Sequence, residues 1–145
     1  MLALTSQYLN QSVIDAAIAL ADQCFPTGEC IVAAALTASG QILTSVHSPA
    51  RVDSASLCAE TGAICEAHKL QQQIVASVCL YRAGPEQPLC VLPACGICQE
   101  RLAYWGLEVE IAVPNDNPEG VAGAPFWQAR TLRQLRPFYW AECVD

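Results

Sequence analysis

The stretch LCAETGAICEAHK (residues 57–69) places a cysteine, Cys58, two positions before a glutamate, Glu60, at the predicted start of a helix. Further along, LPACGICQE (residues 92–100) places two more cysteines three positions apart, again directly before a helical run. Helix N-termini present unpaired N–H groups and the positive end of the helix dipole, which stabilise thiolates and lower the pKa of cysteine. Three thiols and one carboxylate at two helix starts are therefore the candidate site of this sequence.

Around these helix starts, the spacing of apolar residues predicts alternating helices and strands. The predicted helices are residues 7–23, 58–72, 95–105 (stopping at Gly106) and about 129–135. The predicted strands are two within residues 30–46, joined by a turn at Ser39–Gly40, and residues 74–83 and 107–114, with 89–93 as a short strand or extended lead-in. A Pro/Gly/Asn-rich loop is expected at 114–125. This order predicts a mixed sheet with helices on both faces.

Composition narrows the class of protein. The 145 residues are 53% hydrophobic and 14% charged, which predicts one folded domain over residues 1–145. No apolar run approaches the ~20 residues of a membrane span, and the N-terminus lacks the basic and apolar regions of a signal peptide. A cytoplasmic protein is therefore expected. The net charge of −7 argues against a nucleic-acid partner, because phosphate binding needs clustered Lys and Arg.

Nine cysteines are an odd number in a chain for which no secretory segment is predicted, so a disulfide framework is a poor fit. Clustered thiols in a reducing compartment indicate metal binding instead. Six of the nine have no ligand-like spacing, and each is predicted to be a small buried core residue. These six are Cys24, Cys30, Cys65, Cys79, Cys90 and Cys143.

The remaining three cysteines suit an open zinc site. Cys95 and Cys98 form a compact two-ligand C-x-x-C unit, and Cys58 offers a third ligand from another helix start. A structural zinc takes four protein ligands, whereas a catalytic zinc takes three and keeps one position for water. No fourth partner has finger-like spacing, so the sequence predicts a catalytic Zn²⁺. Glu60, within one turn of Cys58, can share the cavity as a proton carrier.

The pattern CAE (58–60) followed by PACGIC (93–98) resembles the zinc signature of the cytidine deaminase family, which includes the blasticidin S deaminases. Relative to that signature one residue, Ala94, is inserted. The segments FPTGECIVAAALTASGQILTS (25–45) and LRPFYW (135–140) are similar to further family segments. The resemblance covers most of the chain. It implies a three-layer α/β/α sandwich with a mixed five-stranded sheet.

The resemblance also implies a set of roles. Cys58, Cys95 and Cys98 would hold one catalytic Zn²⁺ per subunit, and Glu60 would be the catalytic proton carrier. Backbone groups of Ala59 and Cys95 would contact the substrate. Family members of this length form tetramers, so a homotetramer or homodimer is expected. The implied enzyme is a hydrolytic aminohydrolase of nucleobase metabolism that releases ammonia from a cyclic amidine.

Several positions depart from the family pattern. The arginine that usually follows the glutamate, and offsets thiolate charge, is Thr61 here; Arg101 is either its substitute or a surface residue. The pyrimidine-facing phenylalanine is replaced by Cys30, and the ribose-binding Asn and Glu by His47 and Pro49. His47 is either a new substrate contact or an ordinary loop histidine. These changes predict that cytidine is not the best substrate. A base without ribose, a cytosine-bearing antibiotic such as blasticidin S, or another amino-heterocycle is expected.

Three alternatives remain open from the sequence. The chain could be an ordinary cytidine, deoxycytidine or blasticidin S deaminase. It could be a zinc-stabilised binding protein that has lost catalysis, although a structural metal has no use for a nearby non-ligand carboxylate. It could also be a thiol redox protein that uses Cys95 and Cys98.

Overall fold

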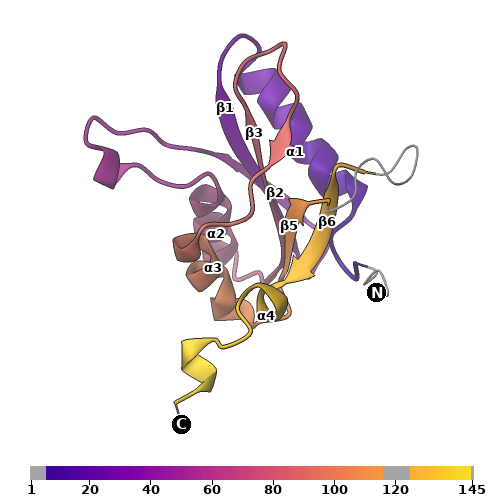
Figure 1. Cartoon of the computed structure of the whole chain (residues 1–145), viewed down its shortest axis with the longest axis vertical. Helices are drawn as coiled ribbons and strands as arrows, with labels where there is room; N and C mark the ends of the chain where they lie inside the picture. Colours follow the sequence, from indigo (N-terminus) through magenta and orange to yellow (C-terminus); the bar gives the residue numbers. More distant parts are fainter. Residues whose placement is uncertain (1–5, 116–124, 145) are drawn as a thin grey trace.

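The computed structural model of the chain describes residues 6–115 and 125–144 (Figure 1). The helices are α1 (Gln11–Cys24), α2 (Glu60–Lys69), α3 (Gly96–Leu102) and α4 (Leu132–Leu135). The strands are β1 (Cys30–Thr37), β2 (Ile42–Val46), β3 (Ile74–Arg82), β4 (Cys90–Val91), β5 (Glu110–Pro114) and β6 (Trp127–Thr131). Most of the predicted loop at 114–125 lies outside the described residues. No helix in the described part of the chain is long and apolar enough to cross a membrane.

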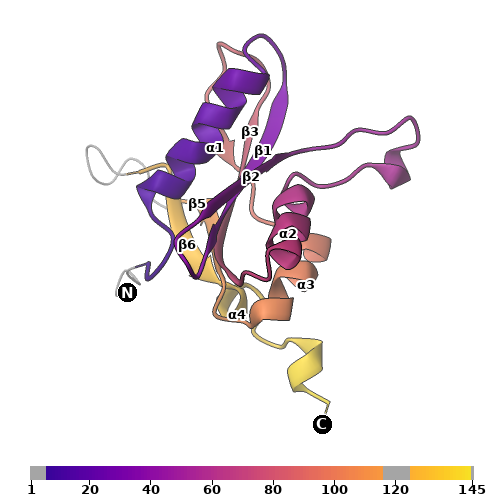
Figure 2. The ribbon, with the colours of Figure 1, turned by 180° about the vertical axis from the view of Figure 1, so that it is seen from behind.

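The strands form one mixed sheet with the order β2-β1-β3-β5-β6, and β4 pairs with β3 beside this path. All pairings are antiparallel except that of β3 with β5, which is parallel. Helix α1 covers one face of the sheet, and α2 and α3 lie together on the other (Figures 1 and 2). The predicted α/β sandwich with helices on both faces is confirmed.

The sheet has six strands rather than the expected five, because residues 127–131 form β6. The sequence predicted a helix from about residue 129. Only Leu132–Leu135 is helical, and Thr131 caps it by accepting from the backbone N–H of Gln134. Trp127–Thr131, which ends with the cap residue itself, pairs antiparallel with β5, and this pairing satisfies the backbone of an otherwise open sheet edge. A partner strand thus overrode the local helical pattern.

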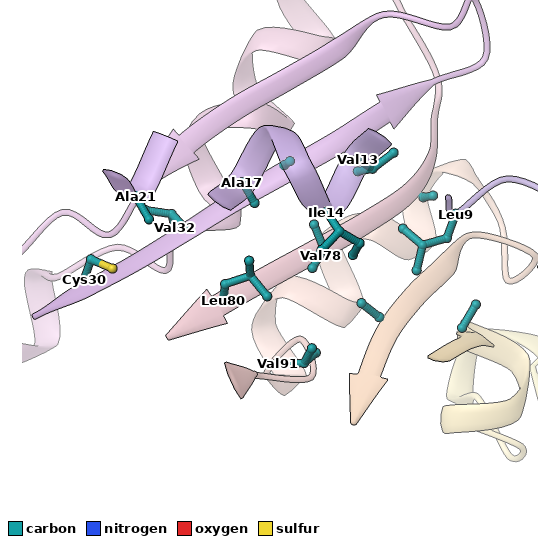
Figure 3. Close-up of a cluster of buried hydrophobic side chains, with 14 residues drawn as sticks. Leu9, Val13, Ile14, Ala17, Ala21, Cys30, Val32, Val78, Leu80 and Val91 are labelled. Atoms are coloured by element: carbon teal, nitrogen blue, oxygen red, sulfur yellow. The ribbon is translucent and has the colours of Figure 1, made fainter. Parts of the chain in front are cut away.

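Helix α1 packs its apolar face on the sheet. Its first turn is capped by Asn10, whose side chain accepts from the N–H of Ser12 at 2.9 Å. The buried face meets even-numbered side chains of β1 and β3, such as Val32 and Val78 (Figure 3). Side chains alternate along a strand, so the odd-numbered residues point to the opposite face, under α2 and α3.

The prediction that all six remaining cysteines are buried is correct for Cys30 and Cys79 and wrong for the others. Both buried residues lie within strands that are covered on two faces. The exposed residues are Cys24, Cys65, Cys90 and Cys143. Cys24 is the last residue of α1, Cys90 lies in the short strand β4, Cys143 lies in the C-terminal segment, and Cys65 lies on the outward side of a helix. Packing requires no apolar side chain at these exposed positions. All nine cysteines are free thiols.

Glu110, the first residue of β5, is a buried carboxylate that anchors the segment leading into α1. Its Oε2 accepts from Ser6 Oγ at 2.7 Å and from the backbone N–H groups of Tyr8 at 3.0 Å and Leu9 at 2.6 Å. Its Oε1 accepts from the N–H of Gln7 at 2.6 Å. Burial by itself would raise the pKa of Glu110, but these hydrogen bonds outweigh it and hold the pKa below its usual value.

We therefore expect Glu110→Gln to lower the free energy of unfolding at pH 7 by about 2–3 kcal/mol, because an amide NH₂ would face N–H donors. The folded-state pKa is depressed, so the carboxylate stabilises the fold above its unfolded pKa of about 4.3 and loses that effect as pH falls through the folded value. Urea unfolding from pH 7 to pH 3 should show the difference between wild type and variant shrinking. The exposed Glu86→Gln is the control, and a difference that stays constant with pH would contradict this role.

Candidate metal centre

Two helix starts bring the three predicted thiols together. Cys58 lies two residues before α2, Cys95 is the N-cap residue of α3, and Cys98 lies in the first turn of α3. The Sγ atoms of Cys58 and Cys95 are 3.4 Å apart, and all three sulfurs lie within 4.8 Å of one another. Cys98 is fully buried, Cys58 is half-buried and Cys95 is exposed. The cluster therefore has a closed side and an open side.

The geometry of this cluster fits Zn²⁺. Bonds of about 2.3 Å in a tetrahedral arrangement place two sulfur ligands roughly 3.8 Å apart. The Cys58–Cys95 spacing of 3.4 Å and the 4.8 Å limit on all three sulfurs are compatible with this distance. Thiolates are the soft donors that zinc prefers. Within the described residues the group consists of three side chains, so a tetrahedral ion would keep one position for a water molecule or substrate.

Glu60 lies beside the cluster without belonging to it. It is the first residue of α2 and is only 5% exposed. Its Oε2 accepts a hydrogen bond from Cys98 Sγ at 3.6 Å. Burial raises the pKa of Glu60, and its own backbone N–H, Cys98 and the charge of Arg101 offset only part of that rise. A buried carboxyl with a raised pKa can exchange protons closer to neutral pH than an exposed one.

The thiols differ in their readiness to ionise. Burial raises the pKa of both Cys58 and Cys98. Burial acts on Cys95 in the same direction, but hydrogen bonds, first among them the one from the N–H of Cys98, outweigh it and lower that pKa. Two of the three thiols thus need a cation beside them to become thiolates, which is the situation that a bound metal ion provides.

The start of α2 is held close to the sheet. A Cβ atom added to Gly62 would lie 2.7 Å from the Cβ of Ser45, so only glycine permits this approach of α2 to β2. The hydroxyl of Ser45 donates to the carbonyl of Ala59. These two contacts set the positions of Ala59 and Glu60 at the centre.

Arg101 of α3 reaches the start of α2. Its Nη1 donates to Thr61 Oγ1 at 2.9 Å, and its positive charge lowers the pKa of the neighbouring Glu60. The residue is also exposed to solvent. The structure thus places Arg101 against the residue that stands where the family arginine was expected, and the contact links the two helices that carry the thiols.

A pocket of about 170 Å³ opens above the cluster. The predicted site residues Cys58, Ala59, Glu60, Cys95 and His47 all line it. The predicted ligand missing from this lining is Cys98, which lies buried behind the others. His47 is therefore at the site rather than in an unrelated loop.

Sequence reasoning missed part of this wall. Ile31 of β1, Cys79 of β3 and Leu92 line the pocket and pack around Ala33 and Ala59. Ile31 and Cys79 are odd-numbered strand positions, so strand alternation was the signal that could have placed them on the face of the site. The apolar wall leaves room for a flat ring beside the thiols and the carboxyl.

A second cavity of about 220 Å³ adjoins this pocket and shares Ile31 and His47 with it. We call the pocket at the thiols the inner lobe and the second cavity the outer lobe. The sequence had assigned Cys30, His47 and Pro49 to substrate-facing positions, and all three line this lobe. Phe25 and Glu29, which the sequence analysis did not single out, complete it.

Comparison with known proteins gives structural matches only. No protein-family model and no curated protein sequence matches the chain. The crystal structure of the cytidine deaminase from Bacillus anthracis has a TM-score of 0.82 and 38% sequence identity, covering 92% of this chain and 90% of that chain. The cytidine deaminase from Mycobacterium leprae has a TM-score of 0.66 at 21% identity, covering 88% and 96% of the two chains. The cytidine deaminase from Burkholderia pseudomallei has a TM-score of 0.67 at 16% identity, covering 91% of this chain and 99% of that chain. The latter two likenesses concern the fold alone.

Proposed function

The chain belongs to the cytidine deaminase family of zinc-dependent hydrolytic deaminases, and we propose that Cys58, Cys95 and Cys98 hold its zinc while Glu60 moves the protons of the reaction. The observation that carries this proposal is the convergence of three thiols beside a buried carboxyl that is not a member of the thiol group. The substrate is an amino-substituted heterocycle, and the products are ammonia and the corresponding oxo compound.

The zinc, when bound, supplies Lewis-acid activation of a water molecule at the open position. Glu60 would accept one proton from the attacking water, whose oxygen bonds to the amine-bearing ring carbon, and would deliver that proton to the ring nitrogen of the heterocycle. It would then carry the second proton, from the hydroxyl now on that carbon, to the amine, whose bond to the carbon breaks so that it leaves as ammonia and the oxo compound remains. The backbone groups of Ala59 and Cys95 orient the ring, since both residues line the pocket beside Glu60.

This arrangement disfavours the two alternatives from other classes. A zinc-stabilised binding protein gains nothing from burying Glu60, since burial of a carboxyl costs free energy. A thiol redox protein would use Cys95 and Cys98 alone and would not need the sulfur of Cys58 3.4 Å from that of Cys95.

We expect an amino-heterocycle without ribose to exceed cytidine by at least about tenfold in kcat/KM. Cys30, His47 and Pro49 line the outer lobe in place of the family's ring-stacking and ribose-binding residues. Each lost contact to a substrate hydroxyl is worth on the order of 1 kcal/mol or more. The measurement is ammonia release from cytidine, free pyrimidine and purine bases, azapyrimidines, triazines and blasticidin S. The 38% identity to a cytidine deaminase favours the second candidate, an ordinary cytidine or deoxycytidine deaminase, and cytidine as best substrate would establish it.

We further expect a homotetramer or homodimer. The C-terminal segment is anchored on α3, where Tyr139 Oη donates to Glu100 at 2.8 Å and Trp140 Nε1 at 3.2 Å. Phe138 and Trp140 nevertheless remain 89% and 60% exposed, so the chain's own core covers neither of them fully. Light scattering at micromolar concentration should give a mass above that of one chain, and Phe138→Asp should reduce it. A monomeric wild type would refute the assembly.

Three broader assignments accompany this proposal. We place the protein in the cytoplasm and in nucleobase metabolism, acting as one domain over residues 1–145. Nine free cysteines suit a reducing compartment.

A further inference from the structure

Ile31 and His47 line both the inner and the outer lobe, and we call this shared boundary the ridge. The backbone N–H of His47 donates to the carbonyl of Ile31 at 2.9 Å, which joins the two ridge residues. The inner lobe, at about 170 Å³, is smaller than the ~300 Å³ at which typical ligand pockets begin. A ligand that fills the site therefore places its ring in the inner lobe and a substituent across the ridge.

The carboxyl groups around the two lobes are not balanced by cationic side chains in their described lining. Glu60 lines the inner lobe, and Glu29 lines the outer one. Among the described residues that line the two lobes, none is a lysine or arginine. The guanidinium of Arg82 contacts the lining residue Phe25 through its carbonyl at 3.2 Å, but Arg82 is buried and is paired with Asp22 at 3.0 Å. A chain with a net charge of −7 adds a long-range field of the same sign.

An anionic substituent, such as a phosphate or carboxylate, would meet repulsion in this lobe without a compensating cation. A positively charged substituent would be attracted on approach and would meet an acidic residue, Glu29, in the lining of the outer lobe. Glu29 is exposed, so water and salt weaken its attraction and the expected selectivity is moderate.

We infer that Glu29 selects substrates whose ring carries a cationic, N–H-rich substituent, so that the preferred substrate class is an unphosphorylated amino-heterocycle with an ammonium or guanidinium side chain. This inference rests on the proposed function, because it assumes that the reacting ring lies beside Glu60. In this inference Glu29 determines which ring substituent is preferred, whereas the thiol cluster and Glu60 carry out the deamination.

The test uses three cytosines substituted at N1 with 3-aminopropyl, 3-hydroxypropyl or 2-carboxyethyl groups. Wild-type kcat/KM should fall in that order. Glu29→Gln should lower kcat/KM for the aminopropyl compound by roughly threefold to tenfold and change the hydroxypropyl value by less than about twofold. The control is Glu66→Gln, which removes an exposed carboxylate from α2 that lines neither lobe and should leave all three values unchanged.

Binding separates this inference from the proposed chemistry. The same compounds are titrated calorimetrically into zinc-loaded Glu60→Gln protein, with and without the additional Glu29→Gln substitution. A preference for the aminopropyl compound that disappears with Glu29→Gln supports the inference, whether or not the wild-type protein turns the compounds over. An absence of turnover by the wild-type protein would overturn the deaminase proposal alone. The role of Glu29 would be overturned if the aminopropyl compound bound equally well with and without the Glu29→Gln substitution. It would also be overturned if none of the three compounds bound.

Discussion

We expect the wild-type protein to purify with about one zinc ion per chain. Cys98→Ser should retain almost none of this zinc, and Cys58→Ser and Cys95→Ser should lose most of it. Each substitution removes one of three sulfurs that lie within 4.8 Å of one another. The remaining two thiols then bind too weakly to retain the ion through purification. Metal content per chain, measured together with free thiol content, reports the loss directly.

The three variants should also lose stability, because zinc binds the folded state and contributes its binding free energy to folding. Cys98→Ser should be the most damaging, by about 3 kcal/mol or more in the free energy of unfolding with zinc present. Cys98 is fully buried, so its loss leaves a buried hydroxyl beside two uncompensated thiols. Cys95 is exposed, and its variant can rehydrate at lower cost. Urea unfolding measures the difference.

The matched control is Cys65→Ser, which changes an exposed cysteine on α2 that belongs to no thiol group in the described residues. It should retain full zinc and wild-type stability. Full zinc in all three of the other variants would show that the ligands have been misassigned.

Glu60→Gln should retain zinc and lose at least about 10²-fold in kcat, the effect typical of a lost general base. Glutamine preserves the shape of the side chain in its buried position, so the thiol cluster should stay intact. It can no longer accept a proton from water or carry one to the ring nitrogen and the amine. The measurement is steady-state ammonia release on the best substrate found in the screen, together with the zinc content of the same preparation.

Glu66→Gln, on the exposed side of the same helix, is the control for Glu60→Gln and should be indistinguishable from wild type. Activity near wild type in a zinc-loaded Glu60→Gln protein would assign the proton transfers to another group. Loss of zinc in that variant would mean that Glu60 supports the metal rather than the proton transfers.

Local sequence patterns were sufficient to predict most helices and strands and the residues at the centre of the candidate site. The helical spacing of apolar residues predicted α1, whose buried face begins at Val13 and Ile14. The positions of Cys58 before one helix, and of Cys95 and Cys98 at the start of another, follow from signals only a few residues long. These signals act through the dihedral angles and hydrogen bonds of neighbouring residues, so they can be recognised without knowledge of the rest of the fold.

Local pattern failed where a segment depends on a distant partner. The sequence predicted a short helix from about residue 129, but residues 127–131 form β6 because β5 offers an open edge. Arg101 could not be placed by spacing, since its contact with Thr61 joins residues 40 positions apart. Glu29 lies within the family-like segment 25–45, but no signal there marked it as a site residue, and only the cavity shows that it lines the same lobe as Pro49.

By itself, then, the sequence determined which segments become helices and inner strands, and that three thiols and a carboxylate stand at two helix starts. The tertiary structure decided that these starts meet, with the sulfurs of Cys58 and Cys95 brought to 3.4 Å across 37 positions of chain. It also decided that Gly62 lets α2 approach β2 and that Cys79 and Ile31 form the wall of the pocket. The physical reason is that periodicity and capping act within a turn or two of chain. Convergence of two helices depends instead on how the whole sheet packs beneath them.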